Sequence, residues 1–64
     1  MDSCTVSASE LFQRAKEMLN DGNTHVTITL DEPDEELPAS VSFEAWKAGS
    51  DYSVGYDSIE SIDA

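Results

Sequence analysis

The sequence predicts an α+β fold in which one N-terminal amphipathic helix packs on a three-stranded antiparallel β-meander, in the order α-β-β-β. Apolar residues recur every three or four positions near the start of the chain, which is typical of a helix with one apolar stripe. Three later segments alternate between apolar and polar residues, which is typical of half-buried strands. Because the helix stripe and one sheet face would cover each other, we expect residues 1–64 to form a single two-layer domain.

The helix is expected over residues 7–21. Ser7 is a favourable N-cap, and Glu10 stands three residues later, as in a capping box. Gly22 is suited to the left-handed C-terminal cap, and Glu10 is one turn before Arg14, so the two can pair. The apolar stripe comprises Ala8, Leu11, Phe12, Ala15, Met18 and Leu19.

Strands are expected over residues 24–30, 39–47 and 52–56, with an acidic loop at 31–38 framed by Pro33 and Pro38. Gly55 within the third strand suggests a bulge or a close backbone approach. The tail, residues 57–64, is either a short helical turn or frayed. The predicted inward sets are Val26, Ile28 and Leu30; Ala39, Val41, Phe43 and Ala45; and Tyr52, Val54 and Tyr56.

The charge balance restricts the class of partner. Fourteen Asp and Glu residues stand against three Lys and Arg, a formal net charge of −11. Direct nucleic-acid binding is excluded because the basic surface that neutralises phosphates is missing. No apolar run is long enough for a membrane span or a signal-peptide core, so a cytoplasmic location without membrane contact is expected.

The size of the chain favours self-association. A domain of about 60 residues buries only about 60% of the surface that its unfolded chain exposes, so its stability is marginal. Cys4 is the single cysteine, which leaves no intramolecular disulfide, and one cysteine with one histidine cannot complete a structural zinc site. We therefore expect a homodimer, joined through an open sheet edge or through packing around Trp46.

The residues that carry chemistry do not form a recognisable catalytic set. Cys4 and His25 are the only classical nucleophile and base, and the negative surroundings disfavour a thiolate. In a calcium loop beginning at Asp31 the sixth position would be Glu36, where an EF-hand needs glycine. No glycine-rich phosphate loop is present. We expect neither an enzyme nor a bound metal or cofactor.

The leading hypothesis is a non-enzymatic inhibitor or adaptor that binds a basic protein surface, as a nucleic-acid mimic does. The alternative is a structural or accessory protein whose acidity reflects solubility or a high-salt habitat. Trp46 points by strand parity onto the polar sheet face, where it contacts a partner or a second copy of the chain. Alternatively, it covers the sheet near the turn, for example by packing on Ile59 or Ile62 of the tail, or a slip in strand register returns it to the core. The candidate partner-binding residues are Asp31, Glu32, Asp34, Glu35, Glu36 and Trp46, to which Asp57, Glu60 and Asp63 can add.

Overall fold

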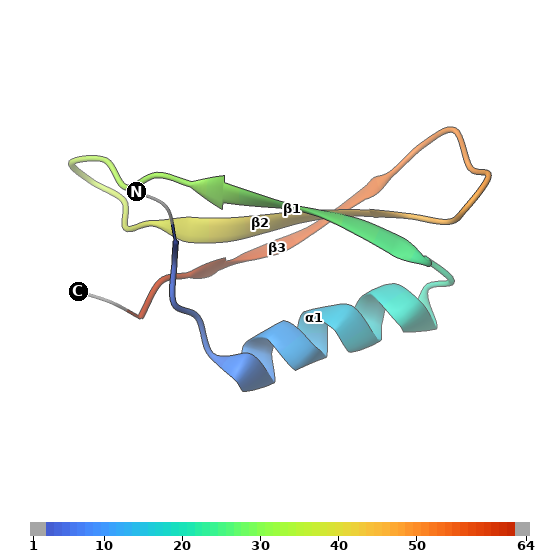
Figure 1. Ribbon diagram of the computed structural model, residues 1–64, viewed down its shortest axis with the longest axis horizontal. Helices are drawn as coiled ribbons and strands as arrows, with labels where there is room; N and C mark the ends of the chain where they lie inside the picture. The colour runs from blue at the N-terminus through green and yellow to red at the C-terminus, as the bar shows by residue number, and fades with distance from the viewer. Residues whose placement is uncertain (1–2, 63–64) are drawn as a thin grey trace.

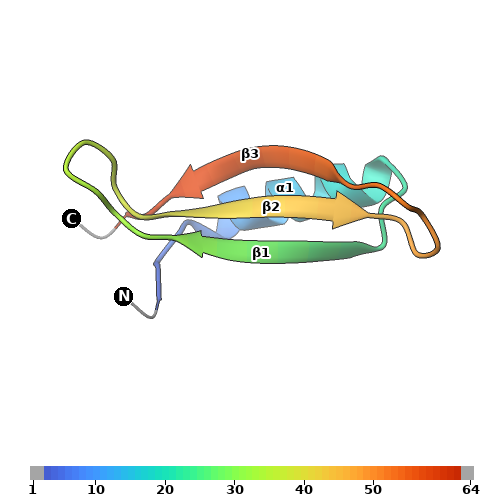
Figure 2. The ribbon, with the colours of Figure 1, turned by 90° about the horizontal axis from the view of Figure 1, so that it is seen from above.

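A computed structural model describes residues 3–62, and it confirms the predicted α-β-β-β arrangement. The helix α1 spans Ala8–Asn20 and is followed by β1 (His25–Asp31), β2 (Ser40–Trp46) and β3 (Val54–Glu60). The strands form one antiparallel sheet with β2 in the centre (Figure 2). The helix runs along one face of this sheet, and the other face is open to solvent (Figure 1).

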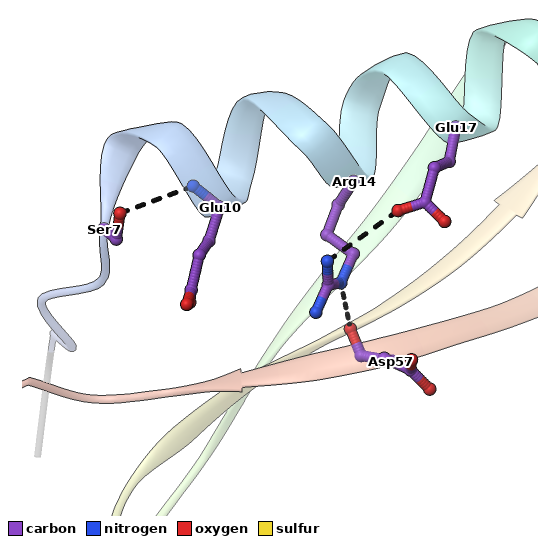
Figure 3. Close-up of polar contacts among 5 residues, drawn as sticks. All are labelled: Ser7, Glu10, Arg14, Glu17 and Asp57. Atoms are coloured by element: carbon purple, nitrogen blue, oxygen red, sulfur yellow. Dashed lines mark hydrogen bonds and ion pairs between the residues drawn. The ribbon is translucent and has the colours of Figure 1, made fainter.

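Both ends of α1 follow the local sequence signals. The Ser7 hydroxyl accepts a hydrogen bond from the Glu10 backbone N–H at 3.4 Å, which satisfies one of the donors that the first turn leaves unpaired (Figure 3). At the other end Gly22 adopts a φ of +90°, and the Asn23 N–H donates to the Met18 carbonyl at 3.0 Å. This is the Schellman arrangement, and it stops the helix where the sequence predicted.

The Glu10–Arg14 pair that the sequence suggested is not the pair that forms. Arg14 instead lies 3.7 Å from the Glu17 carboxylate, and its Nε donates to the backbone carbonyl of Asp57 at 2.9 Å (Figure 3). The guanidinium is thus directed toward β3 and joins the helix to the sheet. The Asp57 carbonyl is already held in place by the sheet, so this hydrogen bond immobilises only one long side chain, whereas an exposed ion pair immobilises two.

The third strand occupies Val54–Glu60 rather than 52–56, so the first half of the expected tail belongs to the sheet. Phe43 pairs with Tyr56 and Val41 pairs with Ile59, which leaves two residues of β3 opposite one residue of β2. This is a β-bulge. It lies just after the place that Gly55 suggested, since Gly55 itself pairs regularly with Glu44. Residues 63–64 of the expected tail lie outside the described part of the chain.

The core is centred on the middle strand. Met18 of α1 packs with Phe43, Ala45 and Ile59, while Val6, Val41 and Tyr56 pack around this cluster. The expectation that the helix covers the apolar faces of all three strands is wrong in extent. Val26 remains 38% exposed and Val54 46% exposed, so the helix covers chiefly the middle of the sheet. Among the other residues expected to point inward, Ile28 and Tyr52 are also exposed.

Candidate functional site

The most acidic part of the surface lies at the end of the sheet where β1 leaves and β2 begins. A hollow of about 280 Å³ there is lined by carboxylates from the end of β1, from the following loop and from the end of β3. Apolar surface from Leu37 and Pro38 forms part of the same hollow. Antiparallel pairing of β3 with β2 is what brings the distant Glu60 to this end. The acidic lining residues are Asp31, Glu32, Asp34 and Glu60.

Asp34 shapes the acidic loop as well as charging it. One of its carboxylate oxygens accepts hydrogen bonds from the backbone N–H groups of Glu36 and Leu37, both at 2.8 Å. The Asp34 N–H in turn donates to the Leu37 carbonyl at 3.0 Å. The side chain therefore closes a local turn, as aspartate commonly does in loops. Glu35 and Glu36 project from this turn as exposed residues.

Trp46 is not part of the acidic end. Trp46 is the last residue of β2, whereas Asp31 pairs with Ser40, the first residue of β2. Seven residues of strand separate the two ends by about 20 Å. The residues predicted to bind a partner therefore fall into two groups, and the structure does not bring them into one site.

The surroundings of Trp46 agree with the interpretation that it covers the sheet near the turn, whereas its contact with a partner stays a prediction. Its ring stacks on His25, with ring centroids 5.7 Å apart and planes inclined by 18°. His25 is its partner across the β1–β2 ladder, so both rings lie on the same sheet face. Packing of Trp46 on the tail is wrong, because Ile59 is buried in the core on the helix side. The His25–Trp46 stack covers part of the otherwise polar face.

Asp57 and Asp63 were also predicted to contribute to partner binding, and Asp57 does not line the acidic hollow. Asp57 lies in the bulged part of β3, where its carbonyl is occupied by Arg14, so it faces different surroundings from Glu60. Asp63 lies outside the described residues.

A tyrosine links β3 to the end of the helix. The Tyr56 hydroxyl donates to the Asp21 carboxylate at 2.6 Å and accepts from the Asn23 side-chain amide at 2.9 Å. The hydrogen bond to Asp21, followed by burial, raises the pKa of Tyr56 above its usual value of 10.0. The two hydrogen bonds join β3 to the C-terminal end of the helix, which favours a structural role for this contact.

The nucleophile and base that the sequence offered are not brought together. The segment carrying Cys4 runs beside the end of β3, where the Thr5 carbonyl accepts a hydrogen bond from Ile62. His25 starts β1 at the other end of the sheet (Figure 1). Within residues 3–62, no group of three or more His, Cys, Asp or Glu side chains is arranged to hold a metal ion.

An apolar groove between α1 and β1 is the feature that sequence reasoning missed. It measures about 190 Å³, and Ala15, Leu19 and Val26 contribute to its largely apolar walls. The sequence carried a partial signal, because the apolar stripe of the helix includes Ala15 and Leu19, which line this groove. Periodicity shows that a helix has an apolar stripe but does not show how far the sheet extends beneath it.

Comparisons of the chain with protein-family models, with curated proteins and with solved structures find no match. In the described part of the chain, no helix has the length and apolar content needed to cross a membrane.

Proposed function

We propose that this chain is a non-enzymatic, cytoplasmic interaction module whose acidic end binds a basic surface of another protein. The observation that supports this proposal is the convergence of carboxylates from β1, the loop and β3 around one hollow. Leu37 and Pro38 add apolar surface beside these charges. A lysine or arginine side chain has matching chemistry, because its methylene groups contact apolar surface while its charged head reaches carboxylates.

The net charge of −11 adds to this local arrangement. A strongly negative molecule attracts a basic partner over long distances and raises the association rate, most of all at low ionic strength. The partner chemistry proposed is therefore a lysine- or arginine-rich protein surface, such as one that otherwise holds nucleic acid.

The test compares two variants of equal charge. The first carries Glu32→Gln, Glu35→Gln and Glu60→Gln at the acidic end. The second carries Glu10→Gln, Glu44→Gln and Asp51→Asn elsewhere on the surface. Each variant changes the formal net charge from −11 to −8, so nonspecific attraction weakens equally in both.

Immobilised wild-type chain and both variants are used to capture proteins from a lysate at low and at high ionic strength. We expect the wild type and the second variant to retain the same basic protein at low salt. The acidic-end variant should bind it about tenfold less tightly, because three exposed charge contacts are worth about 1–3 kcal/mol together. Equal losses in both variants, or no salt-sensitive basic partner at all, would contradict the proposal.

A further inference from the structure

The sheet and the helix leave one side of the molecule uncovered. Seen from above, α1 lies behind β2 and β3, and β1 forms the edge that extends beyond it (Figure 2). On β1, Ile28 is 57% exposed and Val26 is 38% exposed, although both belong to the apolar set of the strand. The groove between Leu19 and Val26 continues this apolar surface onto the helix. The same side of the molecule thus carries apolar groups from two elements.

The amount of exposed surface is large for a chain of this mass. The accessible surface is 4745 Å². A compact monomer of 7.0 kDa exposes about 4,000 Å². The excess of about 700 Å² is close to the 800 Å² or so that each partner buries in a standard protein interface. The radius of gyration is likewise 12.6 Å, where a compact chain of this length gives about 10.7 Å.

The free edge at β1 is suited to pairing with another strand. All seven residues of β1 pair with β2 in one uninterrupted register, and β1 contains no lysine, proline or bulge. These are the devices that usually protect an exposed edge. The edge at β3 is different, because it is bulged and the Ile62 N–H beyond its end is bonded to Thr5. Of the two edges, β1 is the one open to extension.

The backbone groups available at this edge follow from the ladder. The Ser61 N–H donates to the Ala39 carbonyl, so Ala39 and every second residue of β2 after it direct their backbone groups toward β3. Ser40, Ser42 and the alternate residues that follow therefore bond to β1. On β1, the residues between their partners direct their N–H and C=O groups outward. These residues are Val26, Ile28 and Leu30.

The sequence of β1 is complementary to itself around its central residue. If a second β1 lies antiparallel with Ile28 opposite Ile28, then Val26 faces Leu30 and Thr27 faces Thr29. At the two ends, His25 is opposite Asp31. Apolar and threonine pairs of this kind stabilise neighbouring strands, and a two-fold axis needs one surface that fits its own copy.

We propose that a second copy of this chain pairs antiparallel with β1 about a two-fold axis at Ile28, joining the two sheets into one. Both helices then lie on the same face, and the apolar side chains of the two β1 strands become neighbours between them. The repulsion between two chains of net charge −11 opposes this association, so added salt strengthens the dimer. The proposed interface centres on the middle of β1 and shares only Asp31 with the acidic end, so the inference does not depend on the proposed function.

The first test is sedimentation equilibrium of the wild type and two lysine variants. It is carried out in about 0.15 M NaCl, which is near physiological ionic strength, and in about 1 M NaCl, which screens the repulsion between the two chains. Ile28→Lys places two like charges opposite each other at the axis, whereas Val54→Lys makes the same type of change on the other edge strand. Both side chains are about half exposed, so the monomer tolerates either change. We expect the dimer dissociation constant to rise on the order of a hundredfold for Ile28→Lys and little for Val54→Lys.

The second test is a gain of signal that does not depend on a disruptive variant. In a Cys4→Ser background, Ile28→Cys places two thiols at facing positions whose Cα atoms are about 5.5 Å apart, within the range for a disulfide. Mild oxidation should convert this variant into a covalent dimer, while Val54→Cys in the same background should stay largely monomeric.

A wild type that sediments as a monomer at all concentrations and at both salt levels would overturn the proposal. The apolar surface would then be a binding site for a different protein. A dimer that survives Ile28→Lys, with equal cross-linking of the two cysteine variants, would also overturn it. Circular dichroism is used to check that the Ile28→Lys variant is folded. If this variant is unfolded, the cross-linking of the two cysteine variants decides.

Discussion

A comparison of substitutions at Ile59 and Ile62 tests where the hydrophobic core ends. They are the same residue type, three positions apart, and in an exposed tail they would be equivalent. In the structure Ile59 is 2% exposed and packs in the central cluster, whereas Ile62 is 67% exposed. The perturbation is the matched pair of single substitutions Ile59→Ala and Ile62→Ala, which remove the same atoms from two different environments.

The expected magnitudes differ several-fold. Truncating a buried isoleucine to alanine costs about 2–5 kcal/mol, from lost burial and from the cavity that remains. A 64-residue chain has a total stability of about 3–10 kcal/mol. Ile59→Ala therefore removes about half of the stability, and its Tm falls by about 15 °C, at roughly 4–8 °C per kcal/mol. Ile62→Ala changes the free energy of unfolding by about 0.5 kcal/mol or less, since its backbone hydrogen bond to Thr5 is retained.

The assay is urea and thermal unfolding followed by far-ultraviolet circular dichroism, at one protein concentration because self-association adds to apparent stability. Equal losses for the two variants, or a larger loss for Ile62→Ala, would refute the bulged register that turns Ile59 inward.

Other outcomes follow from the same contacts. Arg14→Met should lower the free energy of unfolding by about 1 kcal/mol, because the Asp57 carbonyl loses its donor; Lys16→Met, on an exposed part of the same helix, should have little effect in the same urea titration. The raised pKa of Tyr56 means that the folded state holds the phenolic proton more tightly than the unfolded state, so this stabilisation is complete below pH 10.0 and is lost as pH rises through the higher folded pKa. Tm measured from pH 8 to 12 or so should therefore fall less steeply above pH 10.0 in Tyr56→Phe than in the wild type. Finally, NaCl should raise Tm by several degrees as the Debye length falls from about 10 Å at 0.1 M to about 3 Å at 1 M, starting from a chain already folded in dilute buffer; a chain that folds only in molar salt would favour the accessory protein of a high-salt habitat.

Local signals predicted the elements at the start of the chain well. The Ser7 cap, the Gly22 stop and the alternation of β1 are short-range patterns, and their physical causes lie within a few residues. The third strand was placed too early because Tyr52 fits the alternation as well as Tyr56 does. A bulge changes strand parity, and nothing in the sequence marks the position where one extra residue is inserted.

The candidate site was predicted only in part. The acidic loop was visible as a run of acids, and Glu60 was suggested beside it, but only sheet pairing brings Glu60 to the same hollow. Trp46 was placed on the correct face by parity, whereas its stack on His25 depends on cross-strand register. Arg14 illustrates the same limit, because its carbonyl acceptor lies 43 residues away in the chain.

By itself the sequence determined the order of helix and strands, the caps of the helix and the acidic character of the surface. These properties follow from side-chain type and short-range spacing, which any segment keeps whatever it packs against. The tertiary structure decided which apolar residues are buried, where β3 bulges, and that the helix covers the middle of the sheet and leaves β1 open. Those outcomes depend on the angle and offset at which two layers meet, and these are set jointly by all the contacts between them.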